Sequence, residues 1–140
     1  MASTASNSVP APIVALATWI VPGAGYWLIG QRARALTVGV TIVILFILGL
    51  LVGGMKVVEA PPGVFTNPSN AIAQKPWFVG QILAGPITLI ASSIGQNAGY
   101  FASHSRVNEI GMLYTAVAGM LNLLAIIDAA YWATHPPGAA

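Results

Sequence analysis

The chain has 140 residues, of which 56% are hydrophobic and only 6% are charged. Soluble domains carry about 25% charged residues, and a soluble domain this short does not hide so much apolar surface from water. The five Lys and Arg residues are scattered along the chain, which excludes the dense basic face that nucleic-acid binding requires. The absence of cysteine excludes disulfides and thiolate metal sites. The composition therefore predicts a protein whose solvent is a lipid bilayer.

Residues 1–10 are small and polar, and we expect them to be disordered. The apolar run that follows is interrupted by Pro22 and by two glycines, Gly23 and Gly25. Proline removes a backbone donor and glycine favours a break, so the pattern predicts a short helix over about 12–21 and then a bend. After the bend, Tyr26 and Trp27 suit the level of the lipid headgroups. No basic segment precedes the run, so we do not expect it to be cleaved as a signal peptide.

A tight polar link over 31–34 leads into the uncharged segment 35–54, which is rich in Val, Ile and Leu. At 1.5 Å per residue its length matches the hydrocarbon thickness of a bilayer, about 30 Å. This segment predicts one uninterrupted membrane helix. Residues 11–54 then form a helical hairpin whose first helix is broken.

Proline and glycine pairs in residues 55–75 forbid a continuous helix, and we interpret this segment as a loop outside the membrane. A third span is predicted from about 76 to 100, with a bend at the internal Pro86. A polar turn over 101–108 leads to a fourth span from about Glu109 to Thr134, and residues 135–140 form a tail. The predicted fold class is all-α: a polytopic membrane protein with a four-helix transmembrane bundle, in which 76–134 is the second helix pair.

Four spans place both termini on one side of the membrane and the short links on the other. Arg32, Arg34 and Arg106 all belong to those links. Because positive residues in short loops favour the cytoplasm, we predict that these three arginines set the topology. The expected location is the bacterial inner membrane, with both termini and the long loop outside.

Small residues on the fourth helix predict where helices pack, because helices in lipid associate where their backbones approach closely. Gly111, Thr115 and Gly119 belong to one such stripe, and the third helix has a similar face. We therefore expect the third and fourth helices to pack closely, while the second presents mostly bulky groups to lipid. The alternative is that the stripe is a contact between copies of the chain.

Three polar residues within apolar segments are the candidate functional positions: Asp128, Asn122 and Gln81. A carboxylate inside a membrane span is by default a candidate for a proton relay or an ion site. The alternative is structural, with Asp128 paired to a donor on another helix and the two amides bonded between helices. Asn122 lies on the small-residue stripe, so we expect its side chain to point into the bundle. The two histidines stand alone, and no catalytic, cofactor or metal site is expected.

Two parts of the chain resemble known families. Residues 22–30, PGAGYWLIG, with the basic turn at 31–35, are similar to the hairpin signature of the TM-two domain superfamily. Tyr26 stands where many members carry histidine, so a histidine-dependent site is not implied at the bend. The segment from Glu109 to Ala129 resembles an uncharacterised bacterial membrane-protein family that joins such a hairpin to two further helices. Both resemblances imply an architecture and no activity.

These features favour a non-enzymatic membrane protein that acts as a structural or accessory component. Its expected partners are the lipid bilayer and either another membrane protein or a second copy of the chain. The alternative is a small transporter or channel component in which Asp128, Asn122 and Gln81 line a polar path. A lipid-modifying enzyme would need a cluster of acids or histidines, and the sequence does not supply one.

Overall fold

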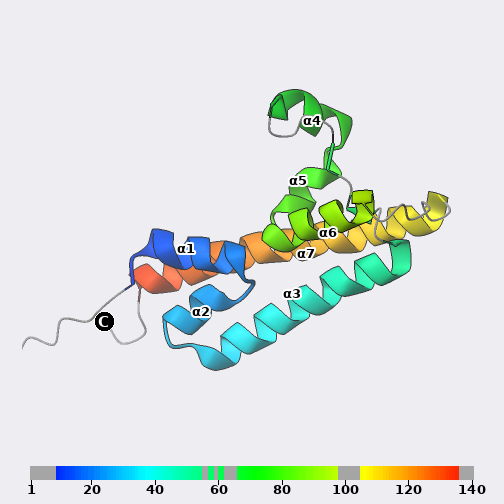
Figure 1. Ribbon diagram of the computed structural model, residues 1–140. Helices are drawn as coiled ribbons and strands as arrows, with labels where there is room; N and C mark the ends of the chain where they lie inside the picture. The colour runs from blue at the N-terminus through cyan, green and yellow to red at the C-terminus, as the bar shows by residue number, and fades with distance from the viewer. Residues whose placement is uncertain (1–8, 55–56, 59, 62–65, 98–104, 136–140) are drawn as a thin grey trace, which may run out of the picture.

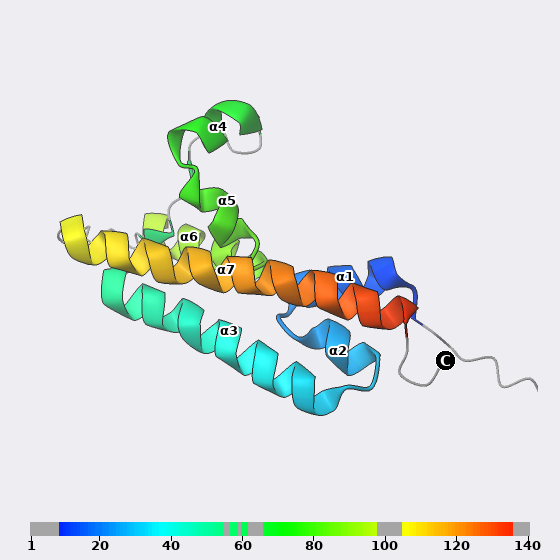
Figure 2. The same cartoon turned by 180° about the vertical axis from the view of Figure 1, so that it is seen from behind.

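The computed structural model describes residues 9–54, 57–58, 60–61, 66–97 and 105–135. Regular structure in these residues is entirely helical. The helices are α1 (Ala11–Ile20), α2 (Ala24–Leu28), α3 (Arg32–Gly53), α4 (Pro68–Gln74), α5 (Trp77–Ile82), α6 (Pro86–Asn97) and α7 (Ser105–Thr134). Figures 1 and 2 show α3 and α7 as two long antiparallel helices, with most of the short helices beside them and α4 standing apart.

The long helices α3 and α7 approach most closely at glycine. A Cβ added to Gly111 would lie 2.6 Å from the Cα of Gly53 and 2.8 Å from the carbonyl oxygen of Gly49, both on α3. Such distances are too short for any side chain, so glycine is what lets these backbones meet. The exposed side of α3 carries large apolar residues such as Leu36, Ile44 and Leu51, as the sequence predicts, whereas its glycine face packs against α7. The unbroken course of α3 over 32–53 confirms the predicted uninterrupted helix.

The predicted break near Pro22 is confirmed. Helix α1 ends at Ile20, Gly23 has a left-handed backbone with φ of 89°, and α2 begins at Ala24. The chain then reverses, and α2 packs closely against α1. A Cβ added to Gly25 would collide with Thr18 of α1. Helices α1 and α2 thus form a short antiparallel unit, which we call the first hairpin.

The third apolar segment also reverses direction, which corrects the prediction of one bent span over 76–100. Helix α5 ends at Ile82, Gly85 has φ of 96°, and α6 begins at Pro86. The hydroxyl of Thr88 donates to the carbonyl of Gln81 at 2.5 Å, tying the first turn of α6 to α5. Helix α6 then runs back towards the start of α7 (Figure 1). We call α5 and α6 the second hairpin; residues 98–100 lie outside the described part.

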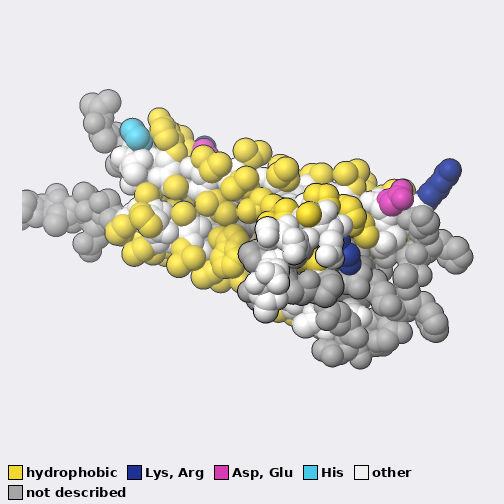
Figure 3. Space-filling view, turned by 90° about the horizontal axis from the view of Figure 1, so that it is seen from above, with side chains coloured by type: hydrophobic (Ala, Val, Ile, Leu, Met, Phe, Trp, Pro, Cys, Tyr) yellow, Lys and Arg dark blue, Asp and Glu magenta, His cyan; other side chains and the backbone are white. Residues whose placement is uncertain are grey.

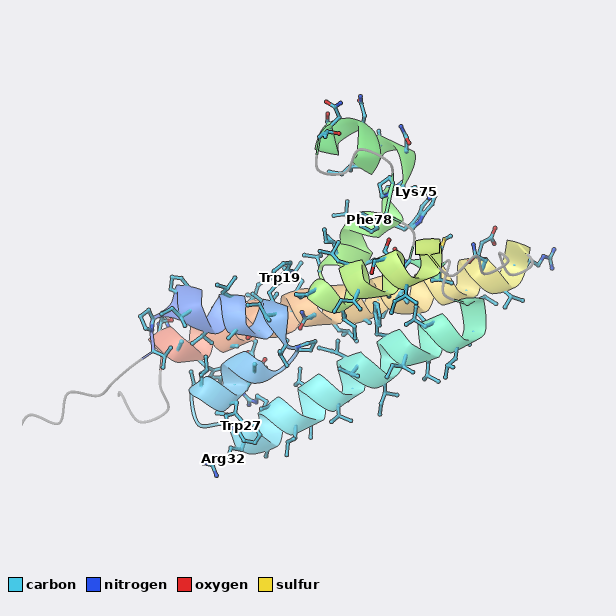
Figure 4. The ribbon with its side chains drawn as sticks, in the orientation of Figure 1. Trp19, Trp27, Arg32, Lys75 and Phe78 are labelled. Carbon is cyan, nitrogen blue, oxygen red and sulfur yellow. The ribbon has the colours of Figure 1, made fainter. Side chains whose placement is uncertain are left out.

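The tips of the two hairpins meet beside the middle of α7. A Cβ added to Gly85 would collide with the carbonyl oxygen of Trp19, at the end of α1. The indole Nε1 of Trp19 donates to the carbonyl of Ile82 at 3.3 Å, and Figure 4 shows Trp19 beside the second hairpin. The two hairpins thus extend from opposite ends of the molecule, and their turns are in contact.

Two helices, Arg32–Gly53 and Arg106–Thr134, are long and apolar enough to cross a membrane. Shorter apolar helices are Ala11–Ile20 and Pro86–Gly95. The predicted four-span bundle is therefore not confirmed.

The segment predicted as a loop, 55–75, contains more structure than its turn residues suggest. Helix α4 projects away from the long helices (Figure 1). Val57 and Val58 are each only 1% exposed and belong to the hydrophobic core. The predicted polar turn over 101–108 is helical from Ser105 onwards, and residues 101–104 lie outside the described part. So do most of the predicted disordered N-terminus (1–8) and of the tail (136–140).

The three arginines predicted to share one side lie at opposite ends. Arg34 is 3.8 Å from Asp128, near the end of α7, whereas Arg106 stands at its beginning. Arg32 lies at the same end as Arg34, and Figure 4 shows it far from Lys75, which precedes α5. Two reversals explain the difference. The second hairpin turns back at Gly85, so Arg106 lies at the end where α3 finishes, and the first hairpin returns the chain to its starting end, so Arg32 and Arg34 lie with the termini. The predicted grouping of the arginines opposite the termini is therefore wrong.

Candidate functional site

Two buried amides lie between α7 and the second hairpin: Asn122 on α7 and Gln81 on α5. Gln81 and Asn122 are both fully buried. The Nε2 of Gln81 donates to the carbonyl of Val57 at 3.0 Å and to the hydroxyl of Thr115 at 2.8 Å. The Nδ2 of Asn122 donates to the carbonyl of Leu83 at 2.9 Å. We call Gln81, Thr115 and Asn122 the buried amide cluster.

The position of Asn122 follows from the break in the second hairpin. In a continuous helix the carbonyl of Leu83 would accept from the residue four positions later, but the chain turns at Gly85. Asn122 satisfies this freed carbonyl from the neighbouring helix. The prediction that Asn122 points into the bundle, towards a carbonyl of the third apolar segment, is confirmed.

Each amide keeps one buried oxygen without a hydrogen-bond partner in the described part of the chain: Oε1 of Gln81 and Oδ1 of Asn122. A buried acceptor that is left unpaired costs free energy, so such atoms need an explanation. In this protein they stand close to the junction of the two hairpin tips. This junction is one candidate for a binding function.

The second polar group is the Asp128 cluster, formed by Tyr26, Arg34, Asp128 and Trp132. The hydroxyl of Tyr26 donates to Oδ2 of Asp128 at 2.7 Å, and Nη1 of Arg34 lies 3.8 Å from the same oxygen. The guanidinium carbon of Arg34 lies 5.3 Å from the centre of the Trp132 ring. Asp128 is thus paired with donors on two other helices, the structural alternative in the sequence analysis.

The sequence predicted Tyr26 at the headgroup level, but the structure buries it to 2% exposure on the inner side of α2. Its hydroxyl reaches Asp128 across 102 positions of sequence, so no local pattern predicts the contact. Trp27, its neighbour, is 52% exposed and stacks with Arg32, 5.8 Å from ring centre to guanidinium carbon. The two aromatics therefore have different roles.

The three candidate polar residues do not line one path. Asn122 and Asp128 are six positions apart on α7, and six steps of about 100° turn them towards different sides of the helix. Asn122 faces the second hairpin, to which Gln81 belongs, whereas Asp128 faces α2 and α3. The polar path proposed for all three residues is replaced by two separate sites.

A groove between α3 and α7 ends at Asp128. Its volume is about 370 Å³, and its walls include Val38, Thr41 and Ile42 of α3 with Leu121, Leu124 and Ala125 of α7. The hydroxyls of Thr37 and Thr41 both donate to carbonyls of their own helix. The groove is therefore lined mainly by apolar side chains along its length and by the carboxylate of Asp128 at one end.

The residues predicted to pack helices lie at two contacts. Gly111 and Thr115 face Gly49 and Gly53 of α3, and Gly119 faces the backbone of Gly80 in α5. The small-residue stripe is thus occupied within one chain by two different neighbours. In the part of the chain that the structure describes, no three His, Cys, Asp or Glu side chains gather as a metal site would require.

The comparison with protein families extends over nearly the whole chain. No curated protein and no solved structure matches it. The likeness of the N-terminal hairpin to the TM-two superfamily stays a prediction. The family of unknown function DUF6677 matches residues 13–138, and the chain belongs to that family.

Proposed function

We propose that this protein is a multi-pass integral protein of the bacterial inner membrane and a non-catalytic accessory component there. The observation that carries the proposal is the distribution of its side chains. Large apolar residues lie outside, including Leu51 at 75% and Leu113 at 65% exposure, while Gln81 and Asn122 are fully buried. Figure 3 shows hydrophobic side chains over most of the described surface on one face. Lipid favours this arrangement and water opposes it.

In the proposed topology only α3 and α7 cross the membrane. The two hairpins enter from opposite sides and end near its centre. Irregular backbone at that depth is tolerated where protein surrounds it, and here Asn122 and Trp19 satisfy carbonyls at the turn of the second hairpin. Both termini then share a side with Arg32 and Arg34.

Single-cysteine labelling tests this topology, and the chain has no native cysteine to interfere. We expect Gln31→Cys and His135→Cys to respond alike to a membrane-impermeant thiol reagent in intact cells, and Asn67→Cys to respond in the opposite way. A four-span bundle requires Gln31→Cys to differ from His135→Cys, so that result would replace the topology. That Arg32 and Arg34 face the cytoplasm stays a prediction, and protection of Gln31→Cys supports it.

An accessory role needs a surface for a partner, and the first hairpin supplies one. A hollow of about 460 Å³ lies between its tip and α3, with small residues Gly23, Ala24 and Gly39 in its lining. Small residues let a second helix approach closely, so we propose that a membrane helix of another protein packs here. The test is copurification in mild detergent with Val40→Trp, which fills the hollow. We expect it to lose a stoichiometric partner that Leu48→Trp, on the same helix, retains.

A second candidate function is transport of a small polar solute or ion. The observation that favours it is the meeting of two broken helices near buried, unpaired amide oxygens, an arrangement that transporters use for midplane sites. Flux into liposomes that Gln81→Leu abolishes and Asp128→Asn preserves would support this function over the accessory role.

A further inference from the structure

The Asp128 cluster and the groove beside it form a unit that the accessory role does not use. The groove is apolar between Val38 and Leu124, and one end reaches the carboxylate of Asp128. A volume of about 370 Å³ lies within the range of small-molecule sites, which is about 300–1,000 Å³. An occupant that matches this surface has a long apolar part and a polar end.

The charged end offers both signs of charge side by side. The side chains of Arg34 and Asp128 are 44% and 48% exposed, so both remain accessible. Both described contacts of Asp128 fall on Oδ2, which leaves Oδ1 open to a donor. The separation of 3.8 Å between Arg34 and Asp128 is too long for a hydrogen bond, so the guanidinium retains capacity for another anion.

The neighbours of this pair hold it in place. Tyr26 is buried and fixes Oδ2 of Asp128 through its hydroxyl. The guanidinium of Arg34 lies over Trp132, and a cation so placed is attracted by the ring face. Stacking engages the flat face of the guanidinium and leaves N–H groups at its edge for an acceptor. Tyr26 and Trp132 therefore hold the charged side chains of Asp128 and Arg34 in position.

We propose that this groove binds one zwitterionic phospholipid whose headgroup carries a primary ammonium, as in phosphatidylethanolamine. The phosphate accepts from Arg34, the ammonium donates to Oδ1 of Asp128, and an acyl chain lies between α3 and α7. A quaternary ammonium has no N–H to donate, and an anionic headgroup without an ammonium meets the carboxylate of Asp128 unpaired. The proposal rests on the membrane location proposed above.

The test measures which lipid the full-length protein retains. The protein is reconstituted into nanodiscs with equal amounts of dioleoyl phosphatidylethanolamine, phosphatidylcholine and phosphatidylglycerol, and retained lipid is identified by native mass spectrometry. We expect one phosphatidylethanolamine per chain. Loss of a charge-assisted hydrogen bond corresponds to about tenfold weaker binding, so Asp128→Asn should reduce retention about tenfold. Arg34→Gln should also reduce retention about tenfold. Arg32→Gln is the control, because Arg32 lies at the same end but stacks on Trp27, and it should not change retention.

A second pair of variants tests the groove without touching the charges. Thr41 is an exposed residue of the groove wall, so Thr41→Phe should fill the groove and displace the lipid, while Leu48→Phe on the same helix should not. Equal retention of the three lipids by the natural sequence, or a preference that survives Asp128→Asn, would overturn the proposal. Extraction of the protein from membranes by alkaline carbonate would instead overturn the membrane location, so the two failures are distinguishable.

Discussion

The two hairpins have the same outline but are held in different ways. The first packs through close backbone approach, with Gly25 against Thr18 and Gly23 against Gly39 of α3. The second also packs closely, with Gly80 against Gly119 of α7, but it adds buried side-chain hydrogen bonds in which Gln81 and Asn122 bind carbonyls of other segments. A helix break in an apolar chain can therefore be stabilised by close packing at glycine alone, or by the same packing together with buried amides.

A side chain added at Gly119 of α7 should push the second hairpin away from this helix, and we expect this change to lower stability the most. A Cβ at Gly119 would collide with the carbonyl oxygen of Gly80. We expect Gly119→Val to destabilise the fold by about 3 kcal/mol or more, at the upper end of overpacking costs. The measurement is unfolding in SDS followed by circular dichroism. Met120→Val, at the next and exposed position, is the control, and equal stability of the two variants would contradict the contact.

Substitution of Asn122 sharpens the comparison, because it separates lost hydrogen bonding from added bulk. Asn122→Ala removes the bond to the Leu83 carbonyl and should cost about 1 kcal/mol, because interhelical hydrogen bonds in membranes are modest. Asn122→Leu adds a branched side chain at a fully buried position and should cost about 1–3 kcal/mol more. The same unfolding assay measures both. If Leu is tolerated better than Ala, the position is looser than the structure indicates.

The smallest effect is expected where the first hairpin meets the Asp128 cluster. Tyr26→Phe removes the hydroxyl that donates to Asp128 but keeps the buried ring, so the expected loss is about 0.6 kcal/mol. Tyr114→Phe, on an exposed part of α7, is the matched control and should change nothing. A loss several times larger for Tyr26→Phe would mean that the first hairpin also depends on side-chain bonds, and the contrast between the hairpins would fail.

The sequence predicts the first hairpin better than the second because its break is encoded locally. Pro22 followed by glycine strongly disfavours a continuous helix, and Gly23 takes the left-handed conformation that glycine adopts at little cost. Pro86 is ambiguous, since an internal proline is compatible with a kink or with a helix end. The outcome depends on Gly85 and on partners such as Asn122, which lies 39 positions from the carbonyl it binds.

The candidate sites show the same division. Burial of Asn122 was predictable from the small-residue stripe around it, because a stripe identifies the face that packs. The pairing of Asp128 with Tyr26 and Arg34 was not predictable as a set, because it depends on the first hairpin returning to the end where it began. The position of Arg106 was predicted wrongly for a related reason, because the third apolar segment reverses at Gly85.

The position of α7 in the chain has a consequence for biogenesis. This helix contacts α1, α2, α3 and α5, and every one of these partners precedes it in the sequence. During synthesis the first hairpin and α3 are therefore made before their shared partner exists, and freed carbonyls such as that of Leu83 lack their donor until Asn122 is made. The last helix is thus the step at which this protein becomes a defined structure.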